Sequence, residues 1–238
     1  MILIGNQRGN AKELAIHLLK EGNERVVVHE VRGFVSEHLN EVFQESYAIS
    51  RATQCKQHLY SLSLNPPKNA KPTVQDFECA INQVEKQLGL IGQPRVIVFH
   101  EKRGFDGELR KHAHAVWCRI DTDKMKAIHL PFTHKKLREV SRSLFVEHNW
   151  RMPDGLIDSK NRNPHNYSLA EWQQAKRAGK NAKELKALFQ DCWSCSDSKT
   201  ALKIALWEQG FVLAKGKRGH VAVDYQGEVY PLSRWAGL

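Results

Sequence analysis

The stretch from Arg95 to Asp121, RVIVFHEKRGFDGELRKHAHAVWCRID, constrains the fold of this chain more than any other. It contains two segments rich in β-forming residues, Arg95–His100 and His114–Ile120, on either side of a loop that carries Gly104 and Gly107. Valine, isoleucine and aromatic residues are enriched in strands, and glycines between two such segments are typical of a turn. The stretch therefore predicts two neighbouring strands.

Histidines stand where these two strands would meet. His100 ends the first strand, and the second begins with His112-Ala113-His114. Because side chains alternate across a strand, His112 and His114 share one face, and His100 joins them if the strands pair. Three imidazoles without a fourth protein ligand describe an open metal site rather than a closed structural one. The alternative is a set of partly exposed histidines, since the chain has 12 of them.

The composition is that of an ordinary globular protein, with 238 residues of which 41% are hydrophobic and 26% charged. Such a chain can bury a substantial core as one large domain or two small ones. It has no apolar run of about 18 residues, so we expect no membrane segment. Its start, MILIGNQRGN, lacks the basic region and the cleavage site of a signal peptide.

Basic residues outnumber acidic ones, 36 against 26, which gives a net charge of +10 and a pI near 9.4. This excess favours a polyanionic partner, most simply nucleic acid. The five cysteines are odd in number and irregularly spaced, which favours reduced thiols and a cytoplasmic location. Cys192 and Cys195 form a lone C-x-x-C, which we interpret as a helix end with two ordinary thiols rather than a zinc or redox motif.

Hydrophobic periodicity predicts helices and strands in the order α-β-α-β-α-β-β up to the histidine-bearing strands. The first helix is predicted to start after Asn10, its N-cap, and to end at Gly22. His17 falls on the flank of the apolar stripe of this helix, from which it can reach into a cleft beside it. The order predicts an α+β fold in which helices pack on a mainly antiparallel sheet.

The remainder of the chain is more basic and contains the best linker candidate. Lys124–Arg151 has a helical apolar face and seven Lys or Arg against two Asp or Glu, which fits either a solvated face or phosphate contacts. Asp154–Tyr167 is polar and has no periodicity. Helical patterns and three short strands follow it. We therefore predict a first domain over residues 1–153, a linker and basic helical segment over 154–197, and a small C-terminal α/β-meander unit over 198–238.

Several motifs together resemble one protein family. The first is VFHEKRG, which is followed by RKHAHAVWCRID. The others, elsewhere in the chain, are LAIHLLKEGNERVVVHEVRGF, SLSLNPP, SLAEWQQAKRAG and RGHVAVDYQGEVYPLSRW. They resemble the mobilisation relaxases of the HUH endonuclease superfamily, which nick plasmid DNA at a transfer origin. The resemblance covers most of the chain and implies an HUH nuclease domain over residues 1–153, in which His100, His112 and His114 match the metal triad.

The resemblance implies a DNA strand transferase that nicks one specific strand during conjugative mobilisation, through a covalent 5′-phospho-enzyme intermediate. It implies a divalent metal ion, Mn²⁺ or Mg²⁺, with Zn²⁺ as an alternative. The implied partners are single-stranded or melted DNA at a plasmid transfer origin and accessory mobilisation proteins. Two alternatives stay open: an HUH replication initiator, and a DNA-binding mobilisation accessory protein that does not cut.

The nucleophile departs from the common pattern of the family. Relaxases commonly carry a tyrosine on the first helix, and here His17 stands at the corresponding position. Since some relaxase groups are thought to use histidine, we predict His17 as the nucleophile, with Tyr47 and Tyr60 as alternatives. A carboxylate bonded to its other nitrogen would fix the tautomer. Glu101, beside the triad, and Glu30 are the candidates for this role.

A single-stranded substrate would be held by basic residues along its backbone and by aromatic rings that stack on bases. Trp117 shares a face with Ala113, opposite the histidines, so we expect it to be core. The basic residues predicted to contact DNA are Arg32, Arg103, Arg110, Lys111 and Arg119.

Overall fold

A computed structural model describes residues 1–19, 24–103, 107–161, 163 and 165–237 of the chain. It divides into two compact units, Met1–Ile157 (unit 1) and Asp158–Leu238 (unit 2). Within this described part, none of the helices is long and apolar enough to cross a membrane. Gly22 and Gly104, predicted to end the first helix and to lie in the central loop, are outside the described residues. The functional division at residues 153 and 197 stays a prediction.

Unit 1 consists of one large sheet and the helices that cover it. Its elements are β1 (Ile2–Arg8), α1 (Ala11–Leu18), β2 (Arg25–Arg32), α2 (Leu39–Arg51), β3 (Leu59–Asn65), α3 (Val74–Leu88), β4 (Arg95–Arg103), β5 (Leu109–Cys118), β6 (Ile120–Asp121), β7 (Lys126–Ala127), α4 (Thr133–Glu147) and α5 (Asp154–Ile157). The five strands of the large sheet have the order β1-β3-β5-β4-β2, and all neighbours run antiparallel. The predicted α+β class, an antiparallel sheet with flanking helices, is confirmed.

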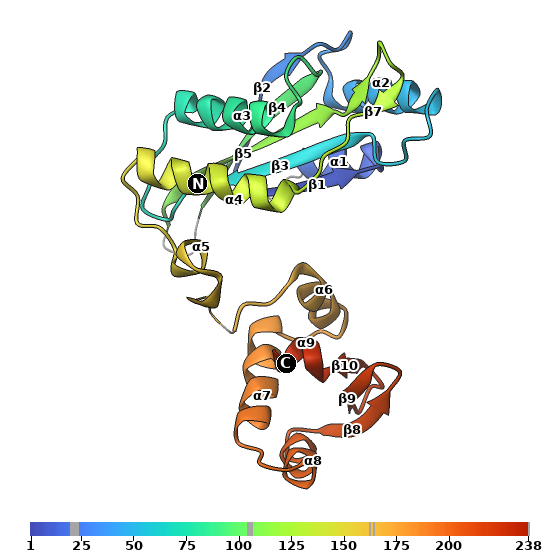
Figure 1. Cartoon of the computed structure of the whole chain (residues 1–238), viewed down its shortest axis with the longest axis vertical. Coiled ribbons are helices and arrows are strands. Elements are labelled where there is room, and N and C mark those ends of the chain that lie inside the picture. The colour runs from blue at the N-terminus through green and yellow to red at the C-terminus, as the bar shows by residue number, and fades with distance from the viewer. Residues whose placement is uncertain (20–23, 104–106, 162, 164, 238) are drawn as a thin grey trace. The chain divides into compact units, whose positions relative to one another are not determined.

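Helices cover both faces of this sheet, and each face has its own apolar core (Figure 1). On one face, residues of α3 and α4 pack against Ile97, Phe99 and Trp117. On the other face, residues of α1 and α2 pack against Val96 and Val98. Successive residues of β4 therefore enter different cores, which explains why this strand is apolar without alternation.

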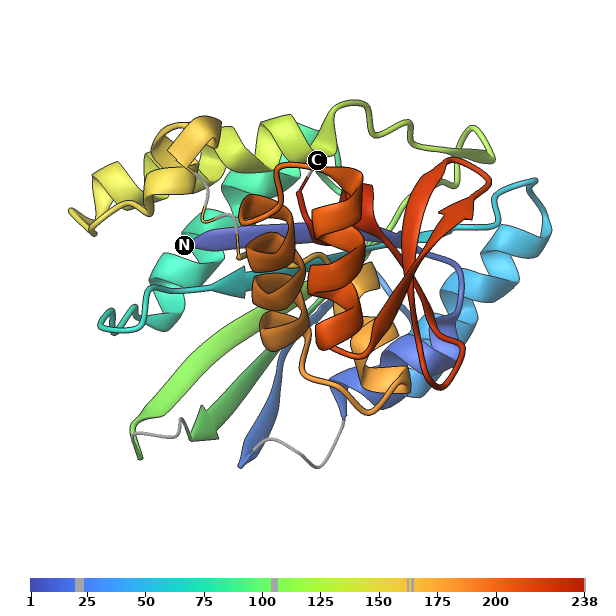
Figure 2. The ribbon, with the colours of Figure 1, turned by 90° about the horizontal axis from the view of Figure 1, so that it is seen from below.

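Strand β5 extends beyond its neighbour β3. The two pair as far as Leu64, which lies opposite Ala113, and β3 ends one residue later in front of two prolines. Proline has no N–H to donate to a sheet, so the chain turns away at this point. Among the described strands, the start of β5 (residues 109–112) is then paired with β4 but not with β3. Figure 2 shows β5 and β4 side by side, with β2 next to them.

Unit 2 has a separate core. Its elements are η1 (Ser159–Asn161), α6 (Leu169–Arg177), α7 (Ala182–Ser194), α8 (Lys199–Glu208), β8 (Phe211–Gly216), β9 (Gly219–Asp224), β10 (Val229–Pro231) and α9 (Leu232–Trp235). The strands form an antiparallel sheet in the order β10-β9-β8, and the helices pack on it around Phe189, Tyr230 and Trp235.

Candidate active site

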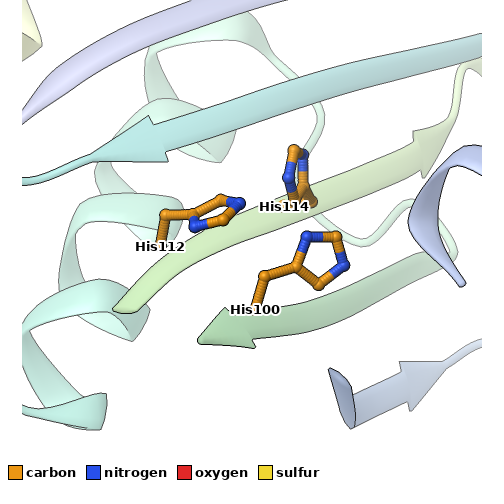
Figure 3. Close-up of side chains that lie close together, drawn as sticks. All are labelled: His100, His112 and His114. Carbon is orange, nitrogen blue, oxygen red and sulfur yellow. The ribbon is translucent and has the colours of Figure 1, made fainter. Parts of the chain in front are cut away.

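The three histidines of the central strands converge on one point. His100 of β4 lies directly opposite His112 of β5, and His114 is two residues further along β5 on the same face. The ring centroids are 4.7 to 5.2 Å apart, and one ligand atom of each ring lies within 4.8 Å of the other two. Figure 3 shows the rings turned toward one another above the two strands. We call these three residues the triad.

Helix α1 fixes the orientation of one member of the triad. The Nε2 atom of His100 lies 2.7 Å from the backbone carbonyl oxygen of Leu18, in the last turn of α1. A carbonyl only accepts, so this nitrogen must carry the proton and donate it. The lone pair of His100 is therefore on Nδ1, which leaves that atom able to bind a metal ion. Backbone carbonyls commonly orient metal-binding histidines in this way.

The surroundings keep the triad neutral. Burial lowers the pKa of His100, lowers that of His112 to about 4 and lowers that of His114 to about 3. Mutual repulsion between the rings and repulsion from His17 act in the same direction. Only a neutral imidazole has a lone pair to give to a metal ion, so the triad is ready to bind one at neutral pH.

The donor set fits a divalent metal ion. Three nitrogen ligands from one side of a sheet would leave further coordination positions open for a substrate oxygen. A cluster of three or more histidine, cysteine or carboxylate side chains can bind one ion when its ligand atoms lie close together. Among the described residues, the triad is such a cluster. The residues present therefore support the metal that the sequence predicts.

His17 lies at the margin of the triad. It stands in the last turn of α1, and its ring centroid is 6.1 Å from that of His114. The predicted N-cap holds, because the Asn10 side chain accepts a hydrogen bond from the backbone N–H of Glu13. The apolar stripe of α1 packs on the sheet and leaves His17 exposed on its flank. The structure thus brings the predicted nucleophile to the predicted metal ligands.

The two alternative tyrosines lie elsewhere. Tyr60 is buried on the opposite face of the sheet beside Trp117, and burial raises its pKa to about 12. Tyr47 of α2 is half-exposed and packs near His58, with 5.9 Å between ring centroids. His58 directly precedes β3, at the end of the sheet away from the triad. Neither phenol is placed to attack a phosphate at the triad.

The two predicted carboxylates also lie away from the nucleophile. Glu101 follows His100 and therefore points to the other face, where its carboxylate is 3.4 Å from the ammonium of Lys111. Glu30 forms two hydrogen bonds of 2.9 Å with Arg95, at the far end of β4. Strand alternation accounts for the first result, and a structural ion pair accounts for the second.

Two of the predicted DNA-contacting arginines have structural partners instead. Arg32 donates to the buried carboxylate of Glu85 and to the backbone oxygen of Gln93. It lies opposite Arg95 in the sheet, five residues along β4 from His100. Arg119 is buried and donates to Gln7 and to the backbone oxygens of residues 57 and 128. Their charges are used inside the fold and away from the triad.

The other three basic residues line a groove that His112 also lines. Arg103 forms an ion pair with Glu24 (2.7 Å), and Lys111 lies 3.4 Å from Glu101. A cleft of about 980 Å³ lies between the β4–β5 hairpin and the loop after β3, and His112 is part of its lining. The loop adds Lys68 and Lys71, which were not among the DNA-contacting residues predicted from the sequence. Acidic side chains in the lining are Glu101 and Glu108, against six basic ones, Lys68, Lys71, Lys102, Arg103, Arg110 and Lys111. The prolines that flank both lysines were the sequence signal for this loop.

A polar row on β3 adjoins the triad and was also missed. Ser63 lies directly opposite His114, so their side chains share a face. The amide of Asn65 donates to the Ser63 hydroxyl over 3.0 Å. Alternation in SLSLN is the signal that could have revealed this row, since its leucines face the core and its polar residues face the triad.

An antiparallel sheet with flanking helices and a histidine cluster on its central strands defines the class of HUH-type α+β nucleases. Residues 11–150 match the family model described as Relaxase: MobA/VirD2-like, nuclease domain. The match covers more than half of the 238 residues, and the chain belongs to this relaxase family. It is therefore a DNA endonuclease that nicks DNA in mobilisation. Comparisons with curated proteins and with solved structures find no match.

Proposed function

We propose that this relaxase cuts one specific DNA strand at a plasmid transfer origin, with a divalent metal ion at the triad and His17 as the covalent nucleophile. The observation that carries the proposal is the convergence of side chains from three elements: His100 from β4, His112 and His114 from β5, and His17 from α1. Strand pairing and helix packing hold these side chains together.

The triad would hold the ion through Nδ1 of His100 and one nitrogen each of His112 and His114. When bound, a divalent ion neutralises the charge on the scissile phosphate and orients it for in-line attack. The Leu18 carbonyl keeps His100 in the correct tautomer, and burial keeps all the ligands neutral. Mn²⁺ or Mg²⁺ suits a phosphate substrate, and Zn²⁺ is compatible with three imidazoles.

His17 would attack the phosphorus atom. A nitrogen–phosphorus bond forms, the bond from phosphorus to the 3′-oxygen breaks, and the departing oxygen ends as a hydroxyl. The proton lost from the other nitrogen of His17 balances the proton gained by that hydroxyl. The 5′-phosphate stays on the enzyme as a phosphoramidate, which conserves the energy needed to rejoin the strand by the reverse reaction.

The groove beside His112 would hold the strand. Its six basic side chains lie around the start of β5, which pairs with β4 but not with β3 among the described strands. They can accompany the phosphates of single-stranded or melted DNA toward the triad. We assign this role to Arg103, Arg110 and Lys111 of the predicted set, together with Lys68 and Lys71.

A labelling experiment tests the nucleophile. Single-stranded oligonucleotides that tile a transfer origin, labelled at the 3′ end, are incubated with the full chain and Mn²⁺ or Mg²⁺. We expect a labelled protein adduct that is lost in acid, as a phosphoramidate is, and that is absent in His17→Ala. Tyr47→Phe and His134→Ala, which changes an exposed histidine on α4, are the matched controls and should form the adduct. An acid-stable adduct that persists in His17→Ala would contradict histidine chemistry.

The metal role needs a separate readout. His112→Asn should abolish nicking and weaken Mn²⁺ binding, measured by calorimetry, while oligonucleotide affinity changes less than about threefold. Equal loss of DNA affinity and nicking would argue against a purely catalytic metal. Oligonucleotides from a replication origin, run in the same assay, test the alternative of a replication initiator.

A further inference from the structure

We propose that unit 2 carries a second DNA-binding surface, formed by α8 and the β8–β9 hairpin, and that this surface takes double-stranded DNA. The family match ends at residue 150, so no function is assigned to this unit by it. The inference rests on the proposed function only in that both concern DNA; its test below does not require nicking.

Helices α7 and α8 form a helix-turn-helix arrangement. α7 ends at Ser194 and α8 begins at Lys199, so four residues join them, which is the connection length of such motifs. Ser198 caps α8 by accepting from the backbone N–H of residue 201. Leu202 and Leu206 enter the core of the unit. The second helix is thereby held by one face, and its other face is open to solvent.

The open face of α8 is basic and carries large side chains. Lys199 and Lys203 are one helical turn apart, and both are exposed. Ile204 and Trp207 are 54% and 68% exposed, although burial would be favourable for both. A helix that shows ammonium groups beside an exposed tryptophan has the chemistry to contact phosphates and base edges.

The β8–β9 hairpin adds positive charge next to α8. Its two-residue turn consists of Lys217 and Arg218, both exposed, and Lys215 lies opposite His220 near this turn. A cavity of about 410 Å³ is lined by both Lys199 and His220, so the start of α8 and the turn end of the hairpin border the same hollow. The basic residues of the helix and the hairpin therefore form one surface.

The acidic residues of unit 2 are partly withdrawn from solvent. Residues 158–238 contain 13 Lys or Arg and 8 Asp or Glu. Two of the carboxylates, Glu171 and Asp224, are buried and held in ion pairs with Lys186 (2.7 Å) and Lys180 (2.5 Å). These pairs stabilise the fold of the unit. Because each pair also uses one lysine, the remaining charged residues keep the same excess of five positive charges, as a DNA-binding surface requires.

Duplex DNA fits this surface better than a single strand. The major groove is about 12 Å wide and admits an α-helix, while a basic hairpin beside that helix can reach the flanking phosphates. Binding a single strand would need a row of exposed aromatic rings. Among the described residues of α8, Trp207 alone has an exposed aromatic ring, so this helix offers no such row. Such a surface would hold duplex DNA while unit 1 acts on the single strand.

The test uses the full chain and a duplex of about 30 base pairs at several salt concentrations. Two double variants remove charge from the surface, Lys199→Gln/Lys203→Gln on α8 and Lys217→Gln/Arg218→Gln on the hairpin. Each should weaken duplex binding at least tenfold at about 0.1 M salt. Each should also reduce the slope of log K against log salt by about 2. The control is Arg177→Gln/Lys183→Gln, which removes the same charge. Figure 1 shows α6 and α8 at opposite ends of α7, so this control lies away from the surface. It should change duplex affinity by less than about twofold.

Two further measurements keep the result interpretable. Circular dichroism melting of each variant reports folding, since the substituted side chains are exposed and the melting temperature should not change. Binding of a short single-stranded oligonucleotide should remain within about twofold of wild type, because unit 1 provides that site. Unchanged duplex affinity in both surface variants, an equal loss in the control, or a loss confined to the single strand would overturn the proposal. Loss of nicking by His17→Ala would leave it untouched.

Discussion

Acid should destabilise unit 1 through the triad in the metal-free protein. Burial lowers the pKa of His112 to about 4 and that of His114 to about 3, whereas in the unfolded chain both stay near the ordinary value of about 6.5. Between these values the unfolded chain binds protons that the folded chain does not. The stability is therefore fully present above pH 6.5 and is lost as the pH falls.

The size of the effect follows from the two shifts. Each histidine contributes a slope of up to about 1.4 kcal/mol per pH unit, and the slope is smaller close to pH 6.5. Together the two should lower the free energy of unfolding by about 3 kcal/mol between pH 6.5 and pH 5. That loss is a large fraction of the stability of an ordinary domain.

Urea unfolding of the chelator-treated chain at both pH values measures this loss, with the two units fitted as separate transitions. His112→Asn/His114→Asn should remove about 3 kcal/mol of the pH dependence of unit 1, while His134→Asn should keep it. Burial also lowers the pKa of His58 and His100, but these residues are present in all the proteins and largely cancel in the comparison. The same pH dependence in wild type and double variant would refute the reasoning.

Two substitutions test the packing that supports the site, both by urea unfolding. Arg95→Ala should lower the free energy of unfolding by about 3–5 kcal/mol, because it leaves the buried Glu85 carboxylate with fewer partners; a loss under about 1 kcal/mol would contradict this. Gly5→Ala should cost about 1–3 kcal/mol, because the added methyl group would overlap the Tyr60 hydroxyl, and an unchanged stability would show that Tyr60 can move aside.

The triad could be predicted because its geometry is local. All three histidines lie on two consecutive strands, and pairing of those strands puts His100 opposite His112. Alternation then decides which neighbours join them. It places His114 on the same face and Glu101 on the other, so the rule that found the histidines also removes the carboxylate from the site.

The first strand could not be predicted in the same way. β1 begins with three apolar residues and then contains Gly5, which breaks the expected alternation and is unfavourable in a strand. Its partner is β3, more than fifty residues later in the chain. Gly5 stands there because the Tyr60 ring crosses the position that a side chain would occupy. That reason lies in a distant residue and leaves no local signal.

Charge alone could not separate the arginines that we propose to bind DNA from those that hold the fold. Arg32 and Arg119 look like Arg110 in the sequence, since all flank or end strands near the histidines. The structure gives Arg32 a buried carboxylate and Arg119 backbone carbonyls as acceptors, whereas Arg110 lines the groove. A basic residue at a strand end has both uses, and only the position of acceptors on other elements decides between them.

In the proposed mechanism, the placement of α1 would couple metal binding to attack by His17. The same turn of the helix carries the Leu18 carbonyl, which orients His100, and His17, which lies beside His114. A change that loosens α1 on the sheet should therefore weaken both functions. Leu14→Ala, which removes a buried contact of α1, should lower Mn²⁺ affinity about 10–100-fold as well as nicking. His17→Ala should lower nicking and leave Mn²⁺ affinity unchanged. If Leu14→Ala stays folded by circular dichroism and binds Mn²⁺ like wild type, the carbonyl of Leu18 does not set the ligand geometry.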